Sequence, residues 1–114
     1  MYSLEPSNKK TLLYFFAPWC TVCKMSIGNL DVVDTDKVNV VRVALDYQSI
    51  EEIHAFAKDA DVQGTVLLGA ERHKKRFNIN GYPTYYILNE NLQVIKHDMG
   101  YSTALGLKLR TETL

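Results

Sequence analysis

With 114 residues, the chain is long enough to bury one hydrophobic core and too short for two ordinary domains, so we expect a single domain over residues 1–114. Its 13 Lys and Arg residues balance 13 Asp and Glu residues, which excludes a strong overall field for attracting nucleic acid or acidic lipid. The apolar runs are only strand-sized, and polar residues occupy much of positions 5–10, so the sequence indicates neither a membrane span nor a signal peptide within it. A protein or a small thiol is therefore the expected partner.

The first half of the chain has the pattern of strand, helix and strand. The expected elements are a brief edge strand at residues 2–4, a buried strand at 11–16, a helix from Cys20 to Leu30 and a second buried strand at 38–45. In this helix Cys23, Ile27 and Leu30 fall on one side, and Gly28 is a point at which it can kink. A parallel crossover of this kind places the carboxyl ends of the strands and the start of the helix on one edge of the sheet.

The next segment begins with a capping box, in which Ser49 accepts from the N–H of Glu52 and Glu52 reaches back to Ser49. This box predicts an amphipathic helix whose apolar stripe is Ile50, Ile53, Phe56, Ala57 and Ala60. A short apolar segment follows at residues 66–68. Residues 70–77 are helix-forming and contain the basic run 73–76, which we interpret as a solvated face in preference to a partner-docking patch.

The last third predicts a β-hairpin and a final helix. Residues 80–84 form a turn, and strands at 85–88 and 92–99 then flank the turn-forming residues Asn89–Asn91. Gly100 then breaks the second strand, and Ser102 is suited to cap a helix in which Leu105 and Leu109 share a face.

Both cysteines of the chain, Cys20 and Cys23, lie where the strand at 11–16 gives way to the helix. A thiol in the first turn of a helix faces unpaired backbone N–H groups and the positive end of the helix dipole, which favour the thiolate. Cys20 is therefore the expected nucleophile. Cys23, one turn further along, is placed to form a disulfide with it, so the pair can cycle between dithiol and disulfide.

Two other uses of the pair are less favoured. A stapling disulfide between such near neighbours closes a very short loop and constrains little of the unfolded chain. A structural zinc ion needs four ligands, and His54, His73 and His97 are scattered without the usual ligand spacing. We therefore predict redox chemistry with neither a metal nor an organic cofactor.

Two motifs resemble the thioredoxin superfamily: Ala17-Pro18-Trp19-Cys20-Thr21-Val22-Cys23-Lys24 and, further along, Gly81-Tyr82-Pro83-Thr84. The resemblance implies an α/β thioredoxin fold, with a central mixed sheet flanked by helices. The segment between Asp46 and Gly69 resembles the helical insertion of the TlpA-type branch, at about residues 47–69. Residues 15–30 and 99–109 resemble the membrane-anchored periplasmic reductases associated with copper-sensitivity suppression.

The resemblance also implies roles for individual residues. Cys20 attacks a substrate disulfide and Cys23 resolves the mixed disulfide, while Pro83 is the family's cis-proline and exposes backbone groups of Tyr82 to a strand-like substrate segment. Trp19 is then a lid beside the thiolate. The alternatives are that Pro83 is an ordinary proline at the start of a strand and that Trp19 packs in the core.

Three positions depart from the family pattern. Tyr14 stands where thioredoxins place a buried carboxylate, Gly28 stands at the helix proline, and Arg42 replaces a lysine and keeps its charge. The route of the Cys23 proton is therefore open between water at the Cys20 edge, Tyr14 and another carboxylate. Between the cysteines, Thr21 and Val22 include no histidine to stabilise a thiolate, which favours a reductant over a strong oxidant.

The sequence thus predicts a thiol–disulfide oxidoreductase that reduces protein disulfides through Cys20 and Cys23. Its expected partners are a disulfide-containing protein and a redox donor protein, which the resemblance places in a membrane. The resemblance also implies a periplasmic monomer, tethered by a segment upstream of residue 1. One alternative is a copper-handling module in which the two thiolates bind Cu(I), and another is a structural domain with idle cysteines.

Overall fold

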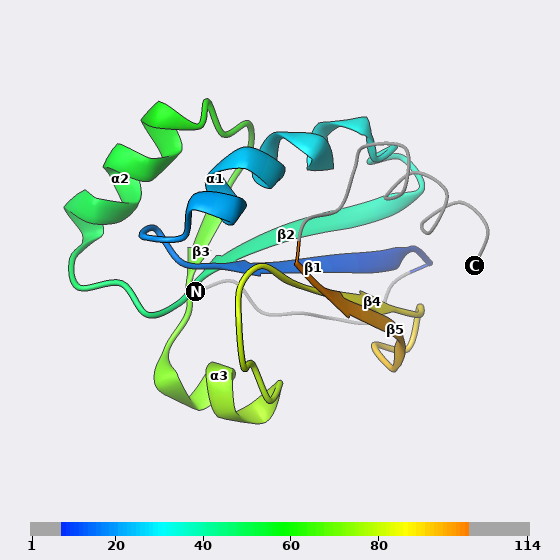
Figure 1. Cartoon of the computed structure of the whole chain (residues 1–114). Coiled ribbons are helices and arrows are strands. Elements are labelled where there is room, and N and C mark those ends of the chain that lie inside the picture. Colours follow the sequence, from blue (N-terminus) through cyan, green and yellow to red (C-terminus); the bar gives the residue numbers. More distant parts are fainter. Residues whose placement is uncertain (1–7, 101–114) are drawn as a thin grey trace.

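In the computed structural model, which describes residues 8–100, five strands form one mixed sheet in the order β3-β2-β1-β4-β5 (Figure 1). The strands β1, β2 and β3 are parallel, whereas β4 runs antiparallel to β1 and β5 antiparallel to β4. In chain order the elements are β1 (Lys10–Phe16), α1 (Thr21–Ser26), the 3₁₀ helix η1 (Ile27–Val32), β2 (Val38–Ala44), α2 (Ile50–Asp59), β3 (Val66–Leu68), α3 (Glu71–Arg76), β4 (Thr84–Leu88) and β5 (Val94–Met99). This is the expected thioredoxin fold.

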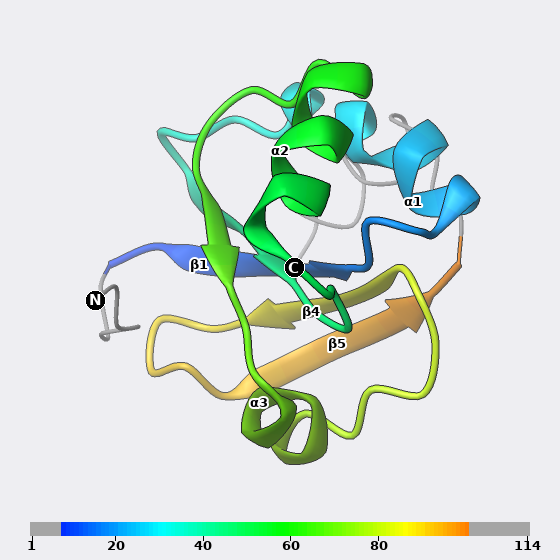
Figure 2. The same ribbon diagram turned by 90° about the vertical axis from the view of Figure 1, so that its left-hand side faces the viewer.

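The central strand β1 is buried from Thr11 to Phe16, because helices cover both faces of the sheet. Leu12, Tyr14 and Phe16 belong to the core under α1, η1 and α2, whereas Leu13 and Phe15 belong to the core on the other face, where α3 lies (Figures 1 and 2). Burial on both faces explains why β1 is almost continuously apolar and does not alternate.

The helix that begins with α1 changes from α-helical to 3₁₀ geometry at Ile27. It runs as an α-helix to Ser26 and continues as the 3₁₀ helix η1, so the expected irregularity falls immediately before Gly28. Cys23, Ile27 and Leu30 are all buried, which confirms the predicted face. The helix therefore packs on the sheet along its full length although its hydrogen-bonding pattern changes.

Helix α2 begins at the predicted position, and two details of its start differ from the expectation. Ser49 accepts from the N–H of Glu52 as predicted, but the Glu52 carboxylate accepts from the N–H of Gln48, one residue before the expected partner. Ile50 is exposed, because the stripe that packs on the sheet begins one turn later, at Ile53 and Phe56. The helix is thus amphipathic over its second and third turns only.

The apolar segment at residues 66–68 is the edge strand β3, which pairs in parallel with β2. The insertion at 47–69 therefore contributes a strand as well as a helix. Gly69 extends this pairing through its N–H to the carbonyl of Ala44, and a Cβ there would lie 2.5 Å from Leu45 Cδ2. A segment of three residues is too short to show a periodicity, so the sequence alone does not identify it as a strand. Its pairing with β2 in the structure does.

The hairpin of β4 and β5 is confirmed, with its second strand starting at Val94 and not at Leu92. Leu92 has a φ of 62° and belongs to the turn, where the Asn89 side chain accepts from the N–H groups of Asn91 and Gln93. The strand expected at residues 2–4 and the helix expected from Ser102 lie outside the described residues. Between residues 8 and 100, no helix is long and apolar enough to span a bilayer.

Candidate active site

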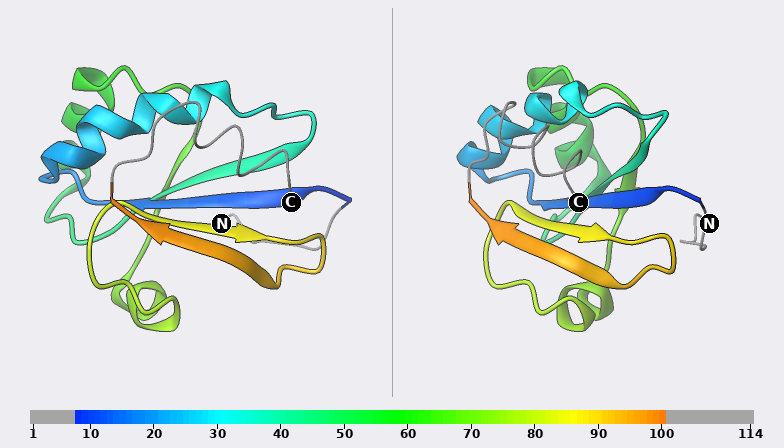
Figure 3. Two further views of the ribbon diagram at one scale, coloured as in Figure 1. Left: turned by 45° about the vertical axis from the view of Figure 1, so that its right-hand side comes forward. Right: turned by 90° about the vertical axis from the view of Figure 1, so that its right-hand side faces the viewer.

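Cys20 lies between the carboxyl end of β1 and the start of α1. Figure 3 shows that the chain passes from β1 into α1 at one end of the sheet. Its N–H donates to the carbonyl of Ala17 at 3.1 Å, which turns the chain from strand to helix. Its backbone is extended, and its Sγ accepts from the N–H of Cys23 at 3.1 Å, so the sulfur itself caps the helix. A backbone donor aimed at Sγ stabilises negative charge on that atom.

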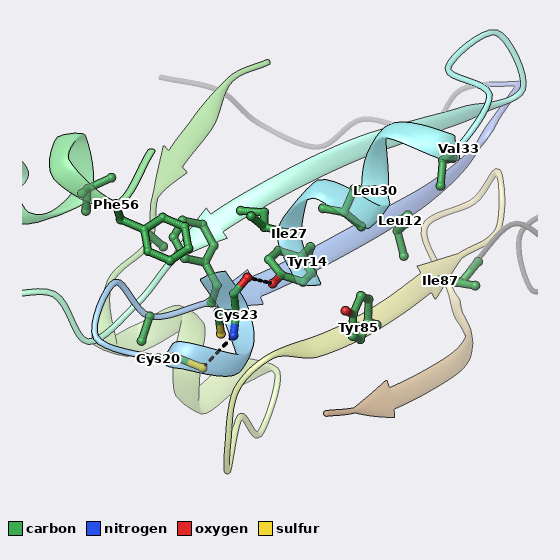
Figure 4. Close-up of a cluster of buried hydrophobic side chains, with 14 of the residues drawn as sticks. Leu12, Tyr14, Cys20, Cys23, Ile27, Leu30, Val33, Phe56, Tyr85 and Ile87 are labelled. Atoms are coloured by element: carbon green, nitrogen blue, oxygen red, sulfur yellow. Dashed lines mark hydrogen bonds between the residues drawn. The ribbon is translucent and has the colours of Figure 1, made fainter. Parts of the chain in front are cut away.

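Cys23 lies one helical turn after Cys20, and both belong to the buried cluster drawn in Figure 4. Its side chain is 0% exposed, against 9% for Cys20, and no disulfide joins the two. Burial raises the pKa of the Cys23 thiol well above its usual range, and the neighbouring Cys20 raises it further. The environments of the two sulfurs therefore differ: Cys20 Sγ accepts from a backbone N–H in a slightly exposed residue, whereas Cys23 is a fully buried thiol.

Tyr14 lies beneath this turn, with its hydroxyl 2.9 Å from Ser26 Oγ and donating to the carbonyl of Cys23 at 3.2 Å (Figure 4). Burial raises the pKa of the phenol far above its ordinary value, so Tyr14 stays protonated at physiological pH. Of the three proton routes left open by the sequence, the one through Tyr14 as a base is thus disfavoured. Ser26 was not singled out from the sequence, and its only signal is its position three residues after Cys23.

Arg42 pairs with Tyr14 across the β1–β2 register and is buried. Its guanidinium meets Asp31 at 3.3 Å, and burial lowers its pKa while Asp31 opposes that shift. The arginine is thus held as an ion pair against η1, which agrees with the expectation that it does not relay protons.

The second side of the site is the turn before β4. The Tyr82–Pro83 peptide bond is cis, and the thiol of Cys20 lies 3.8 Å from the carbonyl oxygen of Tyr82, across 62 residues of sequence. Thr84 Oγ1 donates to the carbonyl of Gly81, and the N–H of Gly100 donates to that of Pro83, so the turn is held at both ends. The two motifs recognised in the sequence therefore meet at one place.

Trp19 is 60% exposed, so it does not pack in the core. Its Nε1–H donates to the backbone carbonyl of Asp46 at 2.9 Å, and its ring meets that of Tyr82 edge to face at 5.7 Å between centroids. Asp46 was not among the residues expected at the site. The only sequence signal for it is its place immediately after a buried parallel strand, at the edge where Cys20 lies.

No cluster of three or more His, Cys, Asp or Glu side chains suited to a metal ion occurs in the part of the chain that the structure describes. The described residues thus show no zinc-type ligand cluster at the two thiols. What the geometry provides is a vicinal dithiol beside a cis-proline turn, which defines the class of thiol–disulfide oxidoreductases.

Comparison with known proteins leads to the same class. The profile of the thioredoxin family matches residues 2–68, more than half of the chain, and the chain belongs to this family. The Thioredoxin-like protein YneN of Bacillus subtilis is 31% identical in an alignment 93 residues long, which covers 75% of this chain and 54% of YneN. Sporulation thiol-disulfide oxidoreductase A of the same species is 29% identical over 117 residues, covering 96% of this chain and 71% of that protein.

Solved structures agree with this assignment. The crystal structure of StoA from Bacillus subtilis superposes with a TM-score of 0.81 at 29% identity, over 92% of this chain and 84% of that chain. The Cys20–Cys23 pair occupies the active-site position of the fold, and a copper-handling role is not favoured because the similar proteins are named for thioredoxin-like and thiol–disulfide chemistry. The chain spans only about half the length of YneN, so the comparison describes this domain and not a whole relative.

Proposed function

We propose that this domain reduces disulfides in proteins, with Cys20 as nucleophile and Cys23 as resolving thiol. The observation that carries the proposal is the Cys23 N–H donating to Cys20 Sγ at 3.1 Å, with the Tyr82 carbonyl 3.8 Å from the same sulfur. One sulfur is thus stabilised as a nucleophile beside a backbone acceptor, and the second is held one helical turn away in the core.

The reaction has two steps. In the first, the Cys20 thiolate attacks one sulfur of the substrate disulfide, a Cys20–substrate disulfide forms, and the departing substrate thiolate takes up a proton. In the second, Cys23 loses its proton and attacks Cys20 Sγ, which forms the Cys20–Cys23 disulfide and releases the other substrate thiol. Two electrons pass from the domain to the substrate, and a redox donor protein restores the dithiol.

Trp19, Tyr82 and Pro83 form the proposed substrate-binding surface. The cis turn presents the Tyr82 carbonyl next to the reactive sulfur, where an extended substrate segment has a backbone partner. The exposed Trp19 ring, which meets the Tyr82 ring edge to face, adds apolar contact beside Cys20. These three residues thus serve binding, and the two cysteines serve the chemistry.

The setting of this reaction rests on the family resemblance. Thr21 and Val22 between the cysteines place no histidine beside the thiolate, which supports reduction as the direction. We place the domain on the periplasmic side of a bacterial inner membrane, tethered there, acting as a monomer and recharged by a membrane-embedded donor.

The experiment that tests the mechanism compares Cys20→Ser, Cys23→Ser and the double variant on a reduced protein with a model protein disulfide. Cys20→Ser is expected to lower the rate of reduction by about a thousandfold or more, because the nucleophile is gone. Cys23→Ser is expected to accumulate mixed disulfides, detected by non-reducing electrophoresis, and the double variant is expected to form none. Wild-type reduction by Cys20→Ser would reject the mechanism.

The direction is tested by the reduction potential in defined glutathione buffers. A value near that of thioredoxin, about −270 mV, supports a reductant. A value near about −120 mV, the range of strong oxidants, would reverse the proposed direction while leaving the roles of the two cysteines intact.

A further inference from the structure

Asp46 lies two residues after the end of β2 and has a φ of 51°, a left-handed conformation that Asp and Asn tolerate better than most residues. This backbone turn directs its carboxylate and its carbonyl to different partners. The carboxylate oxygen Oδ2 accepts from the hydroxyl of Tyr82 at 2.7 Å and from Nζ of Lys74 at 2.8 Å. The carbonyl oxygen accepts from Nε1 of Trp19 at 2.9 Å.

One residue thereby contacts both sides of the proposed binding surface. Trp19 precedes the nucleophile Cys20, and Tyr82 precedes Pro83 and supplies a carbonyl oxygen 3.8 Å from Cys20 Sγ. The ion pair between Lys74 and Asp46 connects this site to α3, which lies on the opposite face of the sheet from α1 (Figure 2). We name Trp19, Asp46, Lys74 and Tyr82 the Asp46 cluster.

The charges of the cluster are mutually supportive. The hydrogen bonds from Lys74 and then from Tyr82 hold the pKa of Asp46 below its usual range, so the carboxylate is ionised at neutral pH. Burial, together with this carboxylate, raises the pKa of the Tyr82 phenol, which keeps it protonated as a donor. Hydrogen bonds to a charged carboxylate are stronger than hydrogen bonds between neutral groups. The bond from the Tyr82 hydroxyl to Asp46 therefore fixes the orientation of the Tyr82 side chain.

We propose that Asp46 is a positioning residue for the substrate: it fixes the contacting rings of Tyr82 and Trp19 beside Cys20, so that an extended segment of a protein disulfide binds along them. The proposal rests on the proposed function and adds a residue that touches neither sulfur. A small disulfide needs only access to Cys20 Sγ, whereas a protein segment also needs the Tyr82 carbonyl and the Trp19 ring in fixed places. Loss of the carboxylate therefore weakens reduction of the protein more than reduction of the small molecule.

The test uses Asp46→Asn and Asp46→Gly, two residues that accept a positive φ, so that the backbone is not strained. Asp61 provides matched controls, Asp61→Asn and Asp61→Gly, because it has the same φ of 51° and an exposed side chain bonded to Gln63. Each variant is assayed with an insulin disulfide and with the small aromatic disulfide 5,5′-dithiobis(2-nitrobenzoate). Trp19 is the only tryptophan of the chain, so its fluorescence reports directly on the cluster.

For Asp46→Asn we expect KM for insulin to rise about threefold to tenfold, as expected for loss of a charge-assisted hydrogen bond, with kcat little changed. Asp46→Gly should show a larger rise, and both should shift the Trp19 emission. The small disulfide should react within about twofold of the wild-type rate. Lys74→Met, which keeps the carboxylate and its bond to Tyr82, should show a smaller rise in KM than Asp46→Asn.

The proposal is overturned if the Asp46 variants match the Asp61 controls in KM and in emission. It is also overturned if the rates of reduction of both disulfides fall equally while the melting temperature falls, because that result is expected for a purely structural role. Failure of the proposed function gives a different result, namely undiminished insulin reduction by Cys20→Ser. The Trp19 emission then still tests whether Asp46 organises Tyr82 and Trp19.

Discussion

The outer and inner sides of the dithiol are built from opposite kinds of contact. On the outer side, Cys20 Sγ accepts from a backbone N–H and lies next to Trp19 and Tyr82. The carboxylate of Asp46 accepts from Tyr82, and the backbone carbonyl of Asp46 accepts from Trp19. On the inner side, Cys23 lies among apolar residues, and the nearest polar pair, Tyr14 and Ser26, carries no charge at neutral pH. The fold thus separates two tasks, since encounter with a substrate needs fixed polar groups at the surface and retention of a proton needs a dry interior.

The largest expected effect comes from removing the Tyr14 ring. Tyr14 is 0% exposed, and its ring lies 5.9 Å from Phe16 and 5.1 Å from Tyr85 between centroids. Tyr14→Ala should therefore lower the free energy of unfolding by about 3–5 kcal/mol, measured by urea denaturation of the reduced protein. Tyr14→Phe should cost only about 1 kcal/mol, because Ser26 Oγ still donates to the carbonyl of Cys23.

The same pair of variants tests whether the inner side is chemically passive. We expect Tyr14→Phe to reduce protein disulfides at nearly the wild-type rate, with Tyr47→Phe as the control, because Tyr47 donates to a backbone carbonyl away from the dithiol. A loss of about a hundredfold or more, the size typical of a missing acid or base, would show that Tyr14 moves the proton of Cys23.

The second prediction compares the two thiols by alkylation. In the folded, reduced protein near pH 7.5, iodoacetamide should label Cys20 at least about a hundredfold faster than Cys23, since burial blocks access and each pKa unit lowers the thiolate fraction tenfold. Peptide mapping by mass spectrometry measures the two rates. In urea the difference should vanish, and equal labelling in the folded state would contradict the distinction between the two sides.

The smallest effect is on the pH dependence of stability. The pKa of Cys23 is raised from its ordinary value of 9.0, so its contribution to stability is fully present below about pH 9 and is lost as the pH rises toward the folded-state pKa. The reduced wild type should lose about 1 kcal/mol per pH unit above pH 9 relative to Cys23→Ala. Urea denaturation at pH 7 and pH 10 measures this difference, and parallel loss in both proteins would argue against a buried thiol.

Much of the outer side was predictable, because its key residues belong to local patterns. The apolar run of β1, the cysteine spacing and the Ile27 and Leu30 positions are features within a few residues of one another, and they placed Cys20 at a strand-to-helix turn. Local rules failed where pairing decides the outcome. The strand β3 is defined by its pairing with β2, and Leu92 has a positive φ in the turn and does not begin β5. The Glu52 carboxylate accepts from the N–H of Gln48 and not from that of Ser49.

The sequence by itself determined the reactive groups, the order of the elements and the absence of a carboxylate at Tyr14, since these depend on residue identity and short-range periodicity. Only the tertiary structure decided which groups surround each sulfur. Asp46 lies 27 residues from Trp19 and 36 from Tyr82, and the three meet because parallel strands β1 and β2 end at the same edge and the Tyr82 turn returns to it. Contacts over such separations are fixed by the strand order, which no local pattern contains.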